Sequence, residues 1–567
     1  MKLLLKSFSD SRDTVLAYGG FLVLTLVFWG TYVLERGIHS DVYYIILSQT
    51  RPWWAGFIYP HDQSRPLMSL LYHVAYLLSN GSYLSLHIVY GLTVFLTGVL
   101  TFHLVRVVTE SKNQLLAFMA GAIAIVHGGD AAVGLVGIIV VKQSVIGVLV
   151  ASICIVGYCR TKRRVFIPLI FLGQALSLWT YEAGFPLLAT AGVLMMYWYR
   201  RGAQFKAVWV PLAVWLTIPM VFIGQLVWRY VLLHKASYQS QELVLPVSLD
   251  EIVARAFLYL KYGVGFWTWP SIWFPQIADC IDSAVALLWQ PILLGTAISV
   301  LLFLLIGMSL DAKQAIVRKS VLFWAATFLF VSYSPWFFIS NGGGNWRTEF
   351  FAAPSAAFLL ACGVLALARL PFGKYLGLII FSIIVSCGLF AGLVSQLYHT
   401  KRWLEYTSLL EGIVLSAPQI RNDSVVVLLN VPTGSPDRTC KNAPLGDPFQ
   451  DYWYMRTGIE VLYPGRKLEG FYLRSDGSQP PSSGLERLDL ESNGLLLTNI
   501  KTGTTRIVPY DRTLLFEYVE GRGTKLLTEF EVNHRQVEGY LPSKLIVQVK
   551  VPDETLNRLS ASAPHLP

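Results

Sequence analysis

The sequence predicts an α-helical, multi-pass membrane domain of about eleven spans, followed by a soluble α+β domain rich in strands. Of its 567 residues, 54% are hydrophobic and only 14% are charged, which exceeds what a soluble core of this size requires. Apolar runs such as Val15 to Leu34 and Tyr375 to Leu397 are long enough to cross a bilayer. After about Thr400, short apolar runs alternate with Pro, Gly, Ser and charges, a pattern typical of strands and turns.

The first apolar run follows Lys2, Lys6 and Arg12, an arrangement that also begins secretory signal peptides. The run is about 20 residues long and no small-residue cleavage site follows it. We therefore expect it to be retained as the first span.

Basic clusters in four short connections set the expected orientation, because Lys and Arg concentrate in cytoplasmic loops. These clusters are Arg160 with Lys162 to Arg164, Arg200 with Arg201 and Lys206, Lys313 with Arg318 and Lys319, and Arg369 with Lys374. The N-terminus is then cytoplasmic, and the expected spans are 14–34, 84–106, 113–127, 142–159, 165–180, 183–199, 207–231, 290–309, 320–339, 351–369 and 375–397. The run from Leu67 to Leu78 is too short to cross and is expected to lie along the outer interface as an amphipathic helix.

Two domains follow from this pattern: a membrane domain over 1–399 and an extracytoplasmic domain over 400–567. Three outer loops are expected at 35–83, 232–289 and 340–350; the second is rich in Trp and Tyr, and serves either as a membrane anchor or as a lid. In the tail, a first helix is expected over Leu404 to Leu415. Strands are expected around Val425 to Leu429, Leu495 to Leu497 and Leu545 to Val551.

Charge and cysteine content indicate which classes of binding partner to expect. The net charge of +10 is largely carried by the short connections, so it indicates membrane lipid as a partner and not nucleic acid. Cys154, Cys159, Cys362 and Cys387 lie in apolar runs without metal-ligand spacing. Cys280 and Cys440 are the two that could pair in an oxidising compartment.

Five ionisable residues recur at the outer ends of the expected spans: Asp41, Asp62, Lys142, Glu182 and Arg347. A charge against hydrocarbon costs several kcal/mol unless it is paired, solvated or used, so this cluster is a candidate site. A partly desolvated carboxylate at Asp41 suits a general base for a hydroxyl or amine acceptor. Arg347 and Lys142 suit a phosphate group, which would leave as negative charge develops on it.

A lipid-phosphate sugar has its head at this depth, so the residues favour glycosyl transfer from a polyprenyl-phosphate donor. Short motifs also carry a family resemblance over roughly residues 14 to 370. They are Ile38-His39-Ser40-Asp41, Ser64-Arg65-Pro66-Leu67, Leu86-His87, Tyr181-Glu182-Ala183, Arg347-Thr348-Glu349-Phe350 and Ala353-Pro354. The chain resembles the polytopic GT-C glycosyltransferases, in particular protein O-mannosyltransferases and aminoarabinose transferases.

By this resemblance, Asp41 matches the catalytic acid after the first span and Arg347 matches the basic residue that binds donor phosphate. Val42 follows Asp41, whereas some members carry two adjacent acids, so a divalent metal is not supported there. The resemblance implies a GT-C-like fold. From the residues we expect one direct displacement that inverts the anomeric centre, with Asp41 as base and no cofactor.

Each candidate also has a structural interpretation. Asp41 suits the start of an interfacial helix, Arg347 an interfacial anchor, and Lys142 a side chain that snorkels to the headgroups. Glu182 is either a paired structural carboxylate or a group that orients the acceptor or an arginine.

The remaining candidates are acceptor-binding or orienting residues: His61, Asp62, Arg65, His127 and Asp130. A salt bridge within the loop is the main alternative for Asp62 and Arg65. No metal site is expected, because the chain offers no spaced set of three ligands.

The expected protein is therefore a glycosyltransferase, in a bacterial inner membrane, that acts on a glycan, lipid or protein acceptor on the outer side. A lipid-linked glycan ligase or polymerase, and a transporter or flippase for such a glycan, are the alternatives.

Overall fold

The computed structural model describes most of the helices and the strand-rich tail. The described residues are 11–34, 65–79, 83–109, 114–130, 134–188, 206–228, 231, 248–272, 297–298, 319–338, 349–370, 373–431, 455, 458–459, 462–463, 466–474, 486–499, 503–519, 523–529, 531–532, 535–536, 543 and 545–547.

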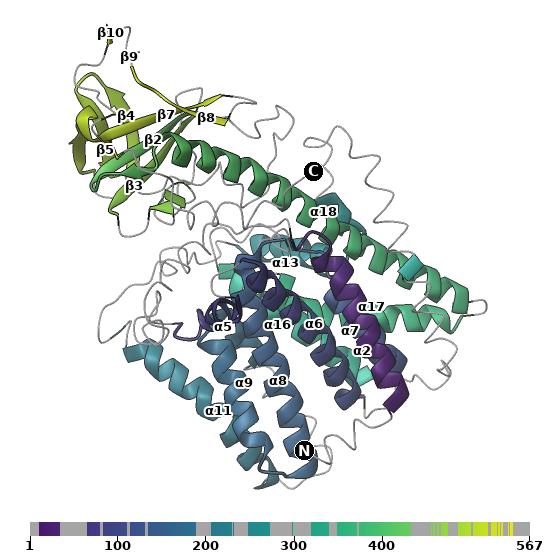
Figure 1. Ribbon diagram of the computed structural model, residues 1–567. Coiled ribbons are helices and arrows are strands. Elements are labelled where there is room, and N and C mark those ends of the chain that lie inside the picture. Colours follow the sequence, from purple (N-terminus) through teal and green to yellow (C-terminus); the bar gives the residue numbers. More distant parts are fainter. Residues whose placement is uncertain are drawn as a thin grey trace.

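A helical bundle forms the larger part of the molecule (Figure 1). Its first elements are α2 (Ser11–Thr25), η1 (Leu26–Gly30), α5 (Leu70–Ser79), α6 (Tyr83–Val108), α7 (Gln114–Ile125), η2 (Val136–Ile138), α8 (Ile139–Thr161), α9 (Phe166–Leu178) and η3 (Glu182–Gly184). It continues with α11 (Lys206–Val227), α13 (Leu249–Gly263), η5 (Phe266–Thr268), α16 (Lys319–Tyr333), η7 (Ser334–Phe338), α17 (Glu349–Ala368) and α18 (Gly373–Ser416).

The helices bear out the prediction of a multi-pass membrane domain. Within the described ranges, five segments are long and apolar enough to cross a membrane: Leu84–Val108, Val136–Thr161, Trp209–Val227, Glu349–Ala368 and Tyr375–Thr400. Four shorter apolar helices coincide with further expected spans: Thr14–Gly30, Gln114–Ile125, Phe166–Leu178 and Val321–Phe337. The expected span 290–309, and most of 183–199, lie outside the described residues.

Neighbouring spans approach closely where glycines face each other. An added Cβ on Gly147 of α8 would lie 2.5 Å from the Gly173 carbonyl oxygen of α9, and a Cβ on Gly173 would lie 2.8 Å from the Gly147 oxygen. Because only hydrogen fits there, the two backbones pack directly, as small residues allow in membrane bundles.

Two amphipathic helices lie outside the set of spans. Helix α5 has only ten residues, and Val74, Leu77 and Leu78 are exposed on it, as expected for a helix at the interface. Helix α13 begins with a Ser248 side-chain cap on the Glu251 amide and exposes Phe257 while it buries Tyr259. One face of each helix therefore packs on the bundle and the other stays apolar and open.

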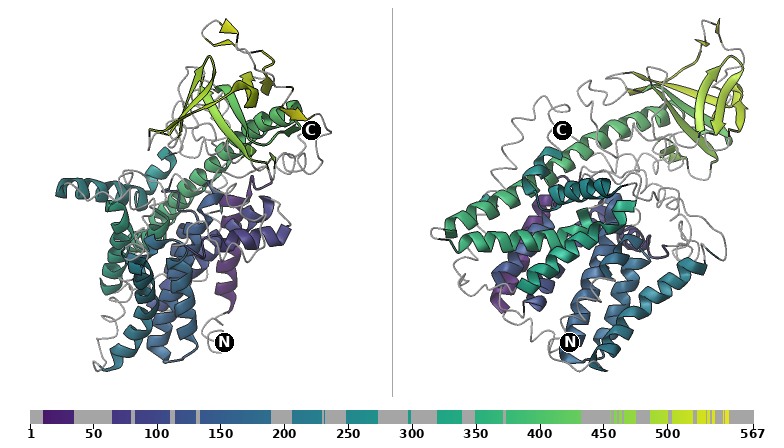
Figure 2. Two further views of the ribbon diagram at one scale, coloured as in Figure 1. Left: turned by 90° about the vertical axis from the view of Figure 1, so that its left-hand side faces the viewer. Right: turned by 180° about the vertical axis from the view of Figure 1, so that it is seen from behind.

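Helix α18 joins the two parts of the molecule without a break. Its 44 residues extend over roughly 66 Å at the usual helical rise. The boundary expected near residue 400 falls inside it, so the last span and the helix expected over Leu404 to Leu415 are one element. Figure 2 shows from two further sides that α18 leaves the bundle and carries the strand-rich part at its end.

The tail is strand-rich, as predicted. Its strands are β1 (Gln419–Ile420), β2 (Ser424–Val431), β3 (Leu468–Arg474), β4 (Glu486–Glu491), β5 (Gly494–Asn499), β6 (Thr505–Val508), β7 (Thr513–Val519), β8 (Gly523–Leu526), β9 (Glu531–Val532), β10 (Arg535–Gln536) and β11 (Ile546–Val547), with the turn η8 (Tyr510–Arg512) before β7. The larger sheet has the order β3-β2-β7-β8, and a second has the order β4-β5-β6. Strand β2 is parallel to β3 and β7, whereas β8 is antiparallel to β7.

Alternate residues of β2 explain how the layers pack. Val425 and Val427 belong to a core with Leu495 of the second sheet, whereas Val426 and Leu428 face the core that includes α18. This two-residue period places the larger sheet between α18 and the second sheet. The Thr524 hydroxyl of β8 donates to the Leu409 carbonyl of α18 at 2.7 Å, which fixes the sheet to the helix.

Candidate functional site

Arg65 and Glu182 form an ion pair with two hydrogen bonds at one end of the bundle. Arg65 Nε donates to Glu182 Oε2 at 2.7 Å, and Nη2 donates to Oε1 at 2.5 Å. The guanidinium carbon also lies 4.7 Å from the centre of the Tyr181 ring. The arginine is almost fully buried while the carboxylate is partly open. Glu182 is therefore paired with Arg65, which is compatible with both roles expected for it, a structural carboxylate and a group that orients an arginine.

Hydrogen bonds attach the segment that contains Arg65 to the ends of two spans. The Leu67 amide donates to the Trp179 carbonyl at 3.0 Å. The Gln143 side-chain amide donates to the Leu67 carbonyl at 3.0 Å and to the Thr180 hydroxyl at 2.7 Å. The start of α5, the end of α9 and the start of α8 are thus held together, with Lys142 adjacent to Gln143 in the chain.

Lys142 is a buried cation, 3% exposed. Its Nζ lies 4.6 Å from the centre of the Phe350 ring, and it interacts electrostatically with Asp130. In the described part of the chain, no hydrogen bond or ion pair holds its ammonium. The side chain lies inside the bundle and does not extend along a lipid-facing surface.

Two carboxylates surround the start of α17. Asp130 Oδ2 accepts a hydrogen bond from the Glu349 amide at 3.1 Å, and so caps this helix. Glu349 itself is fully buried, and its Oε2 accepts from the Tyr333 hydroxyl at 2.7 Å. The Tyr333 ring stacks on Tyr259 with ring centres 5.2 Å apart. Among the described contacts, Asp130 thus binds the N-terminus of α17 and Glu349 binds a tyrosine hydroxyl.

His127 connects this cluster to the outer connection between α11 and α16. Its Nε2 and the Gly263 carbonyl oxygen at the end of α13 are 2.9 Å apart. The His127 ring also lies against Trp269, with ring centres 4.6 Å apart. Trp269 is buried and its indole N–H donates to the Tyr262 carbonyl, so this tryptophan packs within the protein, whereas Trp267 is exposed.

Two consecutive phenylalanines of α17 contact both polar groups, the Arg65–Glu182 pair and the group formed by Lys142, Asp130 and His127. Phe350 faces Lys142, and Phe351 stacks on Tyr181 with ring centres 6.2 Å apart. The Tyr181 ring in turn packs against the Arg65 guanidinium. The structure thus brings together Arg65, Lys142, Glu182, His127 and Asp130, five of the residues predicted for the site.

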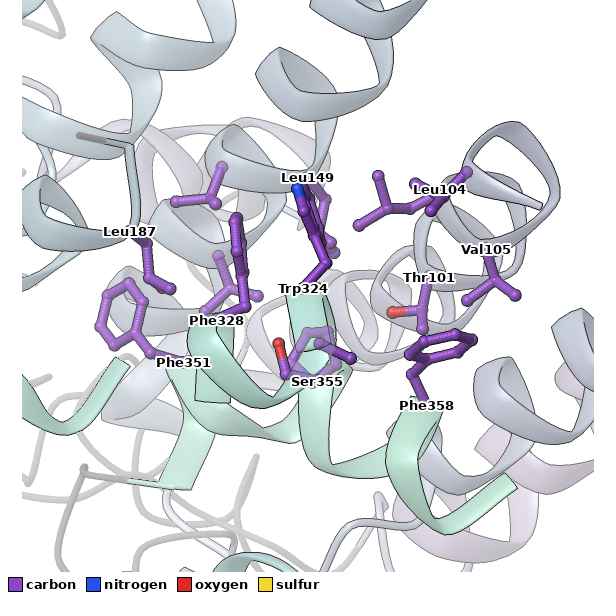
Figure 3. A pocket seen from close by; sticks show the side chains of 15 residues that line it. Thr101, Leu104, Val105, Leu149, Leu187, Trp324, Phe328, Phe351, Ser355 and Phe358 are labelled. Atoms are coloured by element: carbon purple, nitrogen blue, oxygen red, sulfur yellow. The ribbon is translucent and has the colours of Figure 1, made fainter. Parts of the chain in front are cut away.

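A small apolar cavity that is partly open begins one helical turn beyond Lys142. Val145, Val148 and Leu149 of α8 line it, on the helix face that Lys142 occupies at three- to four-residue spacing. Figure 3 shows Trp324, Phe328, Phe351 and Phe358 around this space, with Thr101 and Ser355 as its hydroxyl groups. A buried cation next to an apolar cavity is the arrangement that an anionic amphiphile requires.

Asp41, His61, Asp62 and Arg347 lie outside the described residues, as do Cys280 and Cys440. Their roles remain predictions. Among the side chains that the structure does describe, no group of three or more His, Cys, Asp or Glu is placed to hold a metal ion.

Glu349 and Tyr333 were not among the predicted site residues. Glu349 directly follows the Arg347-Thr348 pair and begins an apolar run, so its signal was a carboxylate at the end of a span. Tyr333 gave no signal, because a tyrosine in an aromatic-rich span is usually part of the core.

Two solved structures are similar to this chain. They are ArnT from Cupriavidus metallidurans bound to undecaprenyl phosphate, with a TM-score of 0.35 and 14% identity, and the same protein in the apo state, with 0.38 and 13%. Each match covers 79% of this chain and 88% of the other. ArnT is an aminoarabinose transferase, the class that the sequence motifs resemble. Both TM-scores are low, so the likeness alone establishes neither fold nor activity.

No protein-family profile and no curated protein sequence matches the chain.

Proposed function

We propose that this protein is a membrane glycosyltransferase that moves a sugar from a polyprenyl-phosphate donor to an acceptor on the outer side of the membrane. The observation that supports this proposal most directly is the buried Lys142 ammonium beside the apolar cavity. Asp130 acts on the Lys142 ammonium only at longer range, so a phosphate could bind this ammonium directly, and an isoprenoid chain could extend into the apolar space. Neither a soluble sugar nucleotide nor a free sugar would use both.

In the proposed reaction, the bond between the anomeric carbon and the phosphate oxygen breaks as the bond to the acceptor forms. Asp41 takes the acceptor's proton from the opposite face, and the electron pair of the broken bond leaves with the phosphate. One displacement inverts the anomeric centre. Lys142 and Arg347 stabilise the charge that accumulates on the phosphate, where fixed cations lower the barrier most.

The described contacts support different roles for Lys142 with Asp130 and for Arg65 with Glu182. Asp130 caps α17 and compensates Lys142, so it positions the phosphate-binding lysine. Glu182 binds the Nε–Nη2 edge of the Arg65 guanidinium through both carboxylate oxygens, which favours a positioning role for Arg65 over direct phosphate binding.

The experiment is transfer from synthetic polyprenyl-phosphate monosaccharides by the purified protein in lipid nanodiscs, with release of polyprenyl phosphate as the readout. Removing one charge-assisted contact costs about 1.5–3 kcal/mol, so Lys142→Met should weaken donor binding roughly 10- to 150-fold. Lys142→Arg should retain more of the binding. Lys525→Met, at an exposed position of β8, is the control and should behave as the unchanged protein.

Two further variants test the predicted roles. Asp41→Asn should nearly abolish turnover while donor binding is retained, and Arg347→Ala should weaken donor binding. Normal transfer by Asp41→Asn would remove this mechanism. A strict need for a diphosphate-linked chain would instead indicate a ligase or polymerase, and lipid translocation without release of polyprenyl phosphate would indicate a flippase.

A further inference from the structure

A second buried cation lies at the opposite end of the bundle from the candidate site. Arg106 is in the last turn of α6 and is only 4% exposed. Its Nη1 donates to the Thr14 hydroxyl of α2 at 3.2 Å. The other end of the same helix pair is fixed by Trp29, whose indole N–H donates to the His87 carbonyl. Helices α2 and α6 are therefore antiparallel, and Arg106 is near the start of α2, on the lower side of Figure 1.

Polar and aromatic side chains surround this arginine. Tyr18 Oη and His103 Nε2 are hydrogen-bonded at 2.5 Å, and the guanidinium carbon of Arg106 lies 5.3 Å from the centre of the Phe102 ring. A hydroxyl, a phenol and an imidazole are all able to donate or accept. Together with Arg106 they form a buried polar cluster between α2 and α6, which is here called the Arg106 pocket.

The pocket contains a cation without an anion. Within the described part of the chain, no carboxylate lies within ion-pairing distance of Arg106, and the Thr14 hydroxyl is its single hydrogen-bond acceptor. A guanidinium has more N–H donors than this one acceptor uses. Burying an uncompensated charge costs several kcal/mol, and a bound anion would remove that cost.

We propose that the Arg106 pocket binds the phosphate of an anionic phospholipid from the cytoplasmic leaflet. Three observations favour a lipid. The pocket is at the end of the bundle where positive loop charges predict the cytoplasmic side. Basic pockets between helices on that side are suited to anionic headgroups. The neighbouring surface of α2 exposes Val15, Leu22 and Val23, along which an acyl chain can lie.

This site is separate from the proposed transferase chemistry, because Arg106 and Lys142 lie at opposite ends of the spans. Its occupancy is measured without any sugar donor. The lipid-binding proposal therefore stands or fails independently of the proposed glycosyltransferase activity.

The test uses the full-length purified protein in detergent, with lipid adducts counted by native mass spectrometry and thermal stability measured in parallel. Phosphatidylglycerol, phosphatidylcholine and inorganic phosphate are added separately. We expect that only phosphatidylglycerol stays bound in the mass spectra and raises the midpoint of thermal unfolding. In Arg106→Ala the affinity for this lipid should fall at least tenfold. Arg163→Ala, in the exposed loop after α8, is the matched control and should bind as the unchanged protein.

Arg106→Lys and Tyr18→Phe keep the test informative if Arg106→Ala does not fold. Arg106→Lys keeps the charge but loses the planar guanidinium, so its affinity for phosphatidylglycerol should decrease in part. Tyr18→Phe should decrease this affinity only slightly. Equal binding of both phospholipids, equal stabilisation by inorganic phosphate, or unchanged phosphatidylglycerol binding by folded Arg106 variants would each overturn the proposal.

Discussion

Buried charges in this bundle differ in how the protein compensates them. Arg65 has a carboxylate on one edge of its guanidinium, held by two hydrogen bonds, and Lys142 has an aromatic face and a carboxylate at longer range. A paired charge stabilises a structure, whereas a cation held by weaker contacts is available to a ligand. At the scale of single residues, the degree of pairing therefore separates the positioning role of Arg65 from the binding role proposed for Lys142.

Glu182→Gln tests the pairing of Arg65. The amide leaves a buried guanidinium without its anion, and because Glu182 is partly exposed we expect a loss of about 1–3 kcal/mol, below the full cost of a broken buried pair. Thermal unfolding in detergent measures it. Glu251→Gln breaks a pair with Arg255 four residues apart within one helix and should cost only a few tenths of a kcal/mol. Equal destabilisation by both variants would show that the Arg65–Glu182 pair contributes no more to stability than the Arg255–Glu251 pair.

Asp130→Asn separates the capping role of Asp130 from its charge. The amide oxygen can still accept from the Glu349 amide, but Lys142 loses its nearby carboxylate. We expect the fold to persist and donor binding to change, whereas Asp130→Ala should also lower stability by roughly 1 kcal/mol through loss of the cap. Binding isotherms and unfolding midpoints of the two variants distinguish these effects. Identical behaviour of both variants would contradict the separation.

Among the elements, α18 has the largest influence on the architecture. It leaves the bundle and ends against β8 without interruption, so the outer domain is attached by a helix and not by a linker. Such an attachment limits the orientations that the outer domain can take above the site. The turn-rich composition after residue 400 did not predict this continuity, because an apolar span and a mixed helix have different compositions even when they form one helix.

Gly412→Ala tests the contact between α18 and β8. An added Cβ would lie 2.1 Å from the Thr524 hydroxyl and 3.0 Å from its backbone nitrogen and oxygen, so the sheet must shift. We expect a destabilisation of about 1–3 kcal/mol, the usual cost of overpacking. Gly363→Ala in α17 has nothing within 4 Å of the added atom and should be neutral or slightly stabilising. Limited proteolysis and thermal unfolding measure both; a neutral Gly412→Ala would mean that the contact is easily displaced.

For the whole molecule, the proposed function requires that the candidate site and the outer domain lie on the same side of the membrane. The described contacts agree, since α18 carries the domain away from the end at which α2 begins (Figure 2). In the proposed orientation, Lys142 and its neighbours would lie near the level at which a lipid headgroup meets water.

Fusions test this topology. Alkaline phosphatase, which is active only outside the cytoplasm of a bacterium, should be active when fused after Pro567 and inactive when fused in the loop at Arg163. A fluorescent protein that matures only in the cytoplasm should give the reverse pattern. The opposite result at both positions would invert the orientation and place the candidate site on the cytoplasmic side.

The sequence alone determined the membrane class, the strand-rich tail and the placement of charged residues at span ends. These are local properties, because hydrophobic length and the position of a charge within it are fixed by neighbouring residues. Only the tertiary structure decided which span ends meet. Arg65 bonds to Glu182 across 117 residues and Asp130 to the Glu349 amide across 219. Such pairings depend on how apolar helices pack in three dimensions, and helices that are apolar on every side carry little periodicity that would specify their neighbours.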